Sequence, residues 1–130
     1  MNTRPEPCVV LFVANVARMT TFYAQVGTMR VVSGDAEHSV LQIDGFQLVI
    51  HQLRGETDPS GGGQMPPAVR EDAYAKLCLP VRSIDEARTV AAPLGGSIKP
   101  ASAEWEARGF RACDGHDPEG NVIQVREAVS

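Results

Sequence analysis

A histidine with acidic residues close on both sides is the first candidate for chemistry in this chain. His116 lies two residues after Asp114 and directly before Asp117. A carboxylate can orient an imidazole for proton transfer, so these residues could act as a general acid–base pair. However, Asp117 opens the segment 117–121, in which Pro118 favours the second position of a turn. The sequence therefore favours a structural or solvent-exposed role for His116.

Two other patterns that carry chemistry are absent or incomplete. Residues 61–63 are three consecutive glycines, but no Lys-(Ser/Thr) pair follows them, and Pro66 and Pro67 prevent the helix start that a phosphate loop needs. A flexible loop is the better interpretation. The pattern Gly-x-Ser-x-Gly does not occur in the sequence, so acyl transfer has no support.

Length and composition bound the class of protein. A chain of 130 residues with 43% hydrophobic residues predicts a single domain over 1–130. The net charge of -4 argues against nucleic acid as a partner and leaves a small molecule. Neither a membrane span nor the apolar core of a signal peptide is present, so we expect a cytoplasmic protein. Three cysteines in apolar segments, Cys8, Cys78 and Cys113, predict buried, reduced thiols.

The elements that must position any site fall into two similar halves. In the first half, about 8–53, an apolar β-branched run precedes a helical stripe that Asn15 caps and Gly27 ends. Short strands separated by turn residues follow it. The predicted elements are a strand at 8–13, a helix at 16–26 and strands at about 29–33, 38–43 and 46–53.

The second half, about 74–127, repeats this order after a linker at about 54–73 that is rich in glycine and proline. Ser83 is the predicted helix cap, and Gly95 and Gly96 the helix stop. The predicted elements are a strand at about 74–81, a helix at 84–94 and strands at about 96–101, 108–113 and 121–127. The repeat of one supersecondary unit predicts a duplicated βαβββ fold.

The closing stretch of the chain resembles a known family pattern. Asp117-Pro118-Glu119-Gly120-Asn121 followed by Val122-Ile123-Gln124-Val125 resembles the last hairpin of the vicinal oxygen chelate superfamily, which includes glyoxalases, extradiol dioxygenases and bleomycin-resistance proteins. Val13-Ala14-Asn15-Val16 with Phe22-Tyr23 is similar to the family's opening pattern. The resemblance covers nearly the whole chain. It implies an α+β fold in which two βαβββ repeats form a cupped mixed sheet with the helices outside, and it implies a homodimer.

Metal-dependent members of that superfamily place four ligands in the first and last strands of the two repeats. The equivalent positions in this sequence are Cys8, Val49, Lys76 and Gln124. Valine has no donor atom, and a lysine brings positive charge to the place of a cation. His51, two residues after Val49 on the same strand face, would serve only in a shifted register. We therefore expect no metal cofactor.

Strand alternation predicts which side chains line the cup if Cys8 faces it. Trp105, the only tryptophan, is either a lid over the core or a stacking surface for a planar ligand, and the resemblance, in which an aromatic often lies at the rim of the cup, favours the ligand. The predicted ligand-binding residues are Cys8, Val10, Phe12, Gln47, Val49, His51, Lys76, Trp105, Gln124 and Arg126. These side chains include no carboxylate. The cup should therefore be positive through Lys76 and Arg126, and its ligand should be anionic or rich in oxygen, and partly planar.

The resemblance leaves two functions open. The first is a glyoxalase/bleomycin-resistance-like protein that binds a small molecule without a metal. The alternative is a metal-dependent enzyme of the glyoxalase or dioxygenase type, a lyase, isomerase or dioxygenase, whose divalent ion would bind vicinal oxygens of the substrate. Metal analysis of the purified protein discriminates between them.

Overall fold

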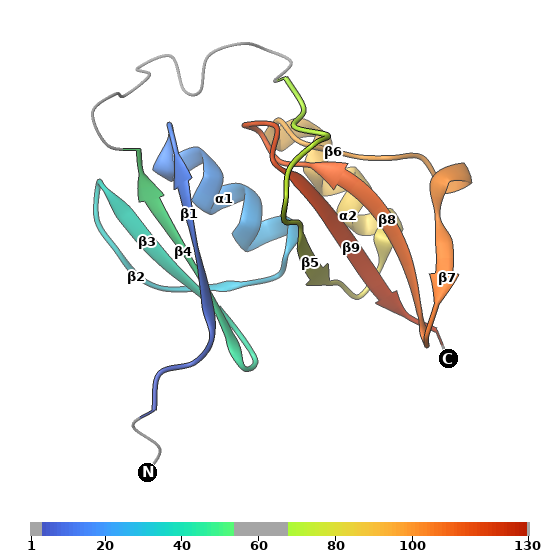
Figure 1. Ribbon diagram of the computed structural model, residues 1–130, viewed down its shortest axis with the longest axis horizontal. Helices are drawn as coiled ribbons and strands as arrows, with labels where there is room; N and C mark the ends of the chain where they lie inside the picture. Colours follow the sequence, from blue (N-terminus) through green and yellow to red (C-terminus); the bar gives the residue numbers. More distant parts are fainter. Residues whose placement is uncertain (1–3, 54–67, 130) are drawn as a thin grey trace.

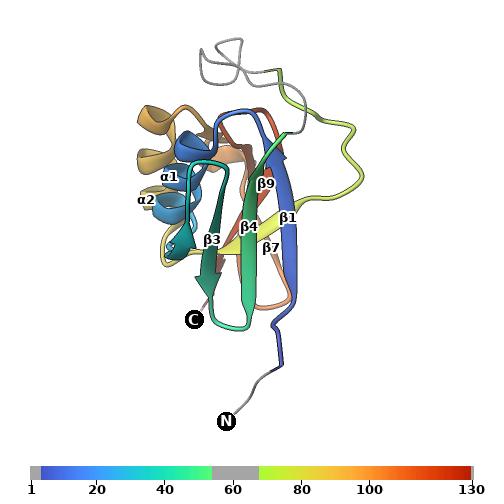
Figure 2. The same ribbon diagram turned by 90° about the vertical axis from the view of Figure 1, so that its left-hand side faces the viewer.

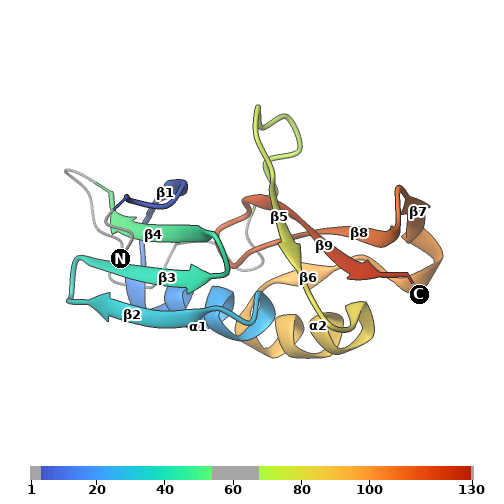
Figure 3. The same cartoon turned by 90° about the horizontal axis from the view of Figure 1, so that it is seen from below.

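The computed structural model of the protein describes residues 4–53 and 68–129, which form two modules of the same kind (Figure 1). Each module packs a helix against a mixed β-sheet, so the α+β fold with two βαβββ-like repeats is confirmed. Figures 2 and 3 show both helices on the same side of the sheets. One face of each sheet is therefore free of helices and available for a site.

The first module matches its predicted elements closely. β1 pairs in parallel with β4, and the other strands pair antiparallel in the order β1-β4-β3-β2. The strand predicted at 29–33 is shifted by one residue, so that Gly34 belongs to the sheet and not to the turn. The elements are β1 (Cys8–Val13), α1 (Val16–Val26), β2 (Arg30–Gly34), β3 (His38–Ile43) and β4 (Phe46–Gln52).

The second module has the same plan with one additional strand. β5 pairs in parallel with β9 in a sheet of order β5-β9-β8-β6, and β7 pairs with β8 off this path. The elements are β5 (Leu77–Pro80), α2 (Ile84–Ala91), the 3-10 helix η1 (Ala92–Leu94), β6 (Ser97–Ile98), the 3-10 helix η2 (Ala101–Ala103), β7 (Trp105–Ala107), β8 (Phe110–His116) and β9 (Val122–Ala128).

Both helices begin at the predicted caps. The Asn15 side-chain oxygen accepts a hydrogen bond from the backbone N–H of Arg18, and the Ser83 hydroxyl accepts one from the backbone N–H of Glu86. These bonds satisfy N–H groups that have no partner inside the helix. The apolar stripe of α1, from Val16 to Val26, is buried against the first sheet.

Prolines shorten two elements of the second module that the sequence predicted to be longer. The helix predicted at 84–94 ends at Ala91, and Pro93, which lacks an N–H, lies in the following 3-10 turn. The strand predicted at 96–101 is reduced to Ser97–Ile98, because Pro100 cannot donate to a strand ladder and the chain enters η2 instead.

Three further strand predictions needed correction. The strand predicted at 108–113 runs from Phe110 to His116, because Gly109 adopts a φ of 89° in the turn before it. Trp105, which lies between two predicted strands, is in β7, and His116, which lies between the predicted strand and the turn 117–121, ends β8. The strand predicted at 74–81 is only Leu77–Pro80. Its partner β9 begins at Val122, so the residues before position 76 have no strand beside them.

The predicted turn 117–121 also joins the two modules. The buried Asp117 carboxylate accepts a hydrogen bond of 2.6 Å from the Tyr23 hydroxyl of α1 and others from the Asn121 side chain and the backbone N–H groups of Glu119 and Asn121. Glu119 accepts from the backbone N–H groups of Ala14 and Asn15. Burial, and then the charge of Asp117, raise the pKa of Tyr23 well above its usual value. The turn therefore fixes the second sheet against the start of α1.

The prediction for the cysteines was partly wrong. Cys113 is buried in the core, but Cys8 and Cys78 are exposed. Cys8 lies on the opposite side of β1 from the buried Val13, and Cys78 lies on the opposite side of β5 from the buried Leu79, so both thiols point to the helix-free side of their sheets. Among the helices described, none is long and apolar enough to cross a membrane.

Candidate binding faces of the two sheets

Six of the predicted site residues share the helix-free face of the first sheet, which we call the first open face. The strand register places Cys8 opposite Gln47, Val10 opposite Val49 and Phe12 opposite His51. The alternate residues Leu48 and Ile50 are fully buried on the other side, against α1. Phe12 is 53% exposed. The first open face is therefore largely apolar.

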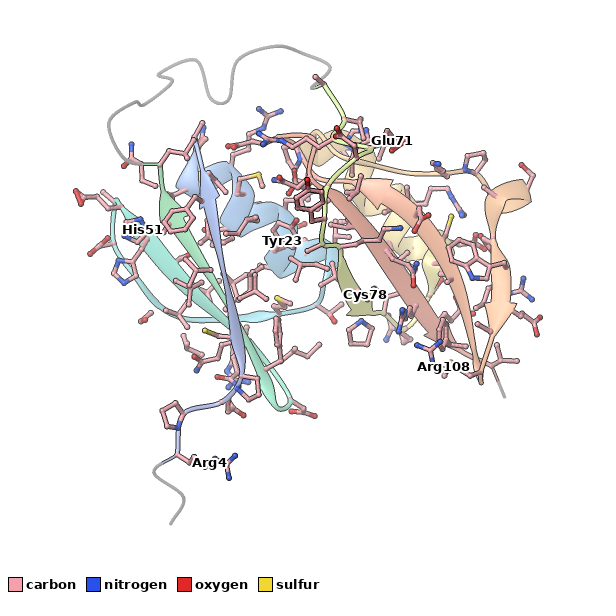
Figure 4. All side chains as sticks on the ribbon, viewed as in Figure 1. Arg4, Tyr23, His51, Glu71, Cys78 and Arg108 are labelled. Atoms are coloured by element: carbon pink, nitrogen blue, oxygen red, sulfur yellow. The ribbon has the colours of Figure 1, made fainter. Side chains whose placement is uncertain are left out.

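The other four predicted residues lie on the helix-free face of the second sheet, which we call the second open face. Gln124 in β9 lies opposite Cys78 and Asp114, and Arg126 lies opposite Ala112. Trp105 in β7 is the other neighbour of Ala112, so Trp105 and Arg126 flank one small side chain. Lys76 directly precedes β5. In Figure 4, His51 of the first open face lies far from Cys78 and Arg108 of the second module.

A chain of hydrogen bonds crosses the second open face. The Lys76 ammonium lies 3.1 Å from Asp114 Oδ1, which also accepts from Gln124 Nε2 at 3.2 Å. Gln124 Oε1 in turn accepts from Arg126 Nε at 2.6 Å. The Arg126 guanidinium lies 4.4 Å from the centroid of the Phe110 ring. The hydrogen bond to Gln124 and the contact with the Phe110 ring therefore fix the orientation of the Arg126 guanidinium.

Asp114 corrects the prediction that the cup contains no carboxylate. Its side chain faces the same way as Gln124 and Arg126 because β8 continues to His116, three residues beyond the predicted strand end. It offsets one of the two positive charges of Lys76 and Arg126. Alternation along β8 would have identified Asp114 as a residue of this face had the strand end been right, and Phe110 lies on the same face within the predicted strand. This face therefore carries less net positive charge than predicted, and Arg126 is the cation of the two that is not paired with Asp114.

A cavity of about 660 Å³ lies beside this network, between β6, β8, β9 and the segment that leads into β5. Figure 4 labels Glu71 and Cys78 near the two ends of that segment. Charged groups of both signs line the cavity, together with apolar carbon from Val69 and Val122. The polar lining residues are Glu71, Tyr74, Lys76, Ser97, Lys99, Asp114 and His116.

His116 does not form the acid–base pair with Asp114 or Asp117 side chains that its position in the sequence suggested. Its Nδ1 lies 2.9 Å from the backbone carbonyl oxygen of Asp117 and donates to it. The Asp117 carboxylate is instead engaged by Tyr23 and Asn121. His116 therefore contributes to the cavity wall, and no carboxylate among residues 4–53 and 68–129 is hydrogen-bonded to its ring.

The four positions that hold a metal in the superfamily do not fit a metal here. Val49 offers no donor, and the Lys76 ammonium is paired with Asp114. Gln124 has both ends of its amide hydrogen-bonded, and it is only 7% exposed. Cys8 alone has a free donor atom of the kind that binds zinc. In the part of the chain that the structure describes, there is no group of three or more His, Cys, Asp or Glu side chains that could hold an ion.

Solved structures show the same fold across the whole chain. An integron cassette protein from the mobile metagenome of V. cholerae is 24% identical with a TM-score of 0.62, covering 98% of this chain and 97% of that one. A glyoxalase/bleomycin resistance protein/dioxygenase family enzyme from Burkholderia phytofirmans is 17% identical with a TM-score of 0.67, covering 94% and 97%.

A third structure is a mutant of the fosfomycin resistance protein FosX from Listeria monocytogenes, complexed with Mn(II) and 1S,2S-dihydroxypropylphosphonic acid. It is 15% identical with a TM-score of 0.64, covering 99% of this chain and 93% of that one. No protein-family model and no curated protein matches the sequence. The chain therefore has the glyoxalase-like fold of these structures.

Proposed function

We propose that this protein binds a small anionic or oxygen-rich, partly planar molecule on the second open face, and that it does so without a metal ion. The observation that carries the proposal is the fixed guanidinium of Arg126, which Gln124 and Asp114 connect to Lys76 at the cavity wall. Gln124 and Phe110 hold the guanidinium in place, so little side-chain entropy is lost when an anion binds. This is the behaviour of a glyoxalase/bleomycin-resistance-like binding protein.

The surrounding residues fit the same class of ligand. A guanidinium binds a carboxylate or phosphonate through two parallel hydrogen bonds. Trp105, 39% exposed and on the other side of Ala112, offers a flat surface for a planar group. Lys76, at the cavity wall, offers a second positive charge that Asp114 holds in position. The ligand of the FosX neighbour, a dihydroxypropylphosphonic acid, is likewise anionic and rich in oxygen.

The metal-dependent enzyme is the weaker alternative for this chain. Its divalent ion would need oxygen, nitrogen or sulfur donors at four positions, and Val49 and Lys76 supply none that suits a cation. The amide of Gln124 is already hydrogen-bonded to Asp114 and Arg126. No step of catalysis is therefore assigned to these residues.

We also propose that two copies of the chain associate as a homodimer. β1 and β5 are edge strands of their sheets, and unpaired edges favour association with another chain. The first open face also exposes Val10 and Phe12, which a partner would cover. Light scattering at micromolar concentration should give twice the chain mass. A monomer mass would contradict the dimer but would leave the binding proposal intact.

The test of ligand class compares Arg126→Ala, Lys76→Ala and Arg82→Ala against a panel of acidic and basic aromatic compounds. Arg82 is the control, because it is an exposed arginine that pairs with Glu86 at the start of α2, away from this face. The wild-type protein should prefer the acids. Loss of a charge-assisted hydrogen bond should weaken acid binding by roughly 10-fold or more for Arg126→Ala, and by less for Lys76→Ala. Preference for basic compounds, or acid binding unchanged in both variants, would overturn the proposal.

A further inference from the structure

Two histidines face each other across neighbouring strands at one end of the first open face. His38 of β3 is the direct cross-strand partner of His51 of β4. Their ring centroids are 6.3 Å apart with an interplanar angle of 27°. Both rings lie on the helix-free side, because the neighbouring residues Ser39 and Ile50 are buried on the side of α1.

Each ring is oriented through its Nδ1 atom. His38 Nδ1 lies 3.0 Å from the Asp35 carboxylate, and His51 Nδ1 lies 2.9 Å from the backbone carbonyl oxygen of Gln52. Both oxygens can only accept, so each Nδ1 carries the hydrogen and each Nε2 keeps its lone pair. A carboxylate or carbonyl that fixes the tautomer in this way is the usual outer contact of a metal-binding histidine.

We propose that His38 and His51 form a two-histidine site for a divalent ion of the Ni²⁺, Cu²⁺ or Zn²⁺ type, which imidazole nitrogen favours. Bond lengths of about 2.0–2.1 Å place two imidazole rings that share a tetrahedral ion roughly 5 Å apart at their centroids. The observed separation is close to that value, and a small side-chain rotation closes the difference. Water would occupy the remaining coordination positions.

The surroundings of the pair support ion binding at this point. Asp35 contributes a negative charge beside His38. Phe12, the cross-strand neighbour of His51 on the other side, has its ring centroid 5.7 Å from that imidazole. The aromatic wall on one side and the carboxylate on the other limit the motion of both rings.

This site is separate from the ligand proposed above. It lies in the first sheet, whereas Arg126 and the cavity lie in the second. It also uses none of the four positions that hold a metal in the superfamily. With only two protein ligands, binding should be weak enough for the ion to be lost during purification in the presence of a chelator.

The test is calorimetric titration of the chelator-treated protein with Ni²⁺ alone. Cys8→Ser and Cys78→Ser are introduced first, because exposed thiols bind the same ions. The expected result is one ion per chain, with affinity lost by about tenfold or more in His38→Ala and equally in His51→Ala. His116→Ala is the matched control, because its Nδ1 also donates to a backbone carbonyl but the residue lies in the second sheet.

Thermal unfolding of each apo variant shows that the fold is kept, and copper electron paramagnetic resonance of the parent should show two nitrogen donors. The proposal is overturned if Ni²⁺ does not bind. It is also overturned if binding survives when both His38 and His51 are replaced, or if His116→Ala lowers the affinity as much as they do.

Discussion

The two open faces have the same strand plan but different surface chemistry. Both are bounded by a parallel edge strand, β1 or β5, and both turn alternate apolar residues toward a helix. The first face carries Val10, Phe12 and Val49, whereas the second carries an ordered chain from Lys76 to Arg126. The two repeats are therefore alike in the residues that pack against a helix and different in the residues that face solvent. Core packing restricts the helix-facing residues, whereas the solvent-facing residues can differ with the ligand that each face binds.

The largest expected effect is a loss of stability when the hydrogen bonds between the turn 117–121 and the first module, which we call the junction, are removed. Asp117→Ala leaves the Tyr23 hydroxyl, the Asn121 amide and two backbone N–H groups without their acceptor in a buried setting. Unfolding free energy should fall by about 3 kcal/mol or more, measured by urea denaturation. Asp85→Ala, an exposed aspartate of α2, is the control and should change stability far less. An equal loss in both variants would contradict a role of Asp117 in joining the modules.

The same junction should respond to alkaline pH through Tyr23. Its pKa is raised in the folded state, so above about pH 10 the unfolded chain releases the tyrosine proton while the folded chain retains it. The contribution of Tyr23 to the unfolding free energy should therefore be fully present below that pH and decline as the pH rises above it. Tyr23→Phe should remove this decline, whereas Tyr74→Phe should not, because Tyr74 is fully exposed. A decline that persists in Tyr23→Phe would refute the assignment.

A matched pair of glutamines sharpens the comparison between the faces. Gln124→Leu removes the acceptor that orients Arg126 and the donor to Asp114, so acidic aromatic compounds should bind several-fold more weakly. Gln47→Leu makes the same change on the first open face, where Gln47 donates to Gln42, and should leave that binding unchanged. If both variants bind as the parent does, Arg126 does not need this support.

Metal analysis tests whether the replacement of metal ligands at the superfamily's four positions has removed metal binding from this protein. Purified in the presence of a chelator, the protein should hold no stoichiometric zinc, nickel, iron or manganese, because Val49 and Lys76 cannot ligate and the Gln124 amide is occupied. Elemental analysis measures this directly. Close to one equivalent of ion, lost on Cys8→Ser, would restore the metal-dependent enzyme.

The smallest expected effect is a difference in rate among the thiols. Cys8 and Cys78, one on each sheet, are exposed and should react quickly with a disulfide reagent. Burial raises the pKa of Cys113, so its thiol should react only as the chain unfolds. The absorbance of the released thiolate should therefore show two fast equivalents and a third that needs denaturant. Three equal rates would contradict the burial of Cys113.

The sequence by itself determined the elements whose signals are local. Asn15, Ser83 and the apolar stripes that follow them predicted the helix starts. Strand alternation in β1, β4 and β9 predicted which side chains share a face. These patterns depend on neighbours only a few residues away, so they can be read without the fold. The repeated order of these elements predicted the duplicated architecture, the family resemblance agreed with it, and the solved structures match it.

The tertiary structure alone decided what those side chains meet. No local sequence pattern predicts that Asp117 accepts a hydrogen bond from the hydroxyl of Tyr23, 94 positions earlier in the chain, or that His38 lies opposite His51. The register between strands, and the extension of β8 that brings Asp114 beside Lys76, depend on long-range pairing. Strand alternation fixes the direction of a side chain, but only the packing of distant segments fixes its partner. That is why the predicted ligand residues lie on two separate faces.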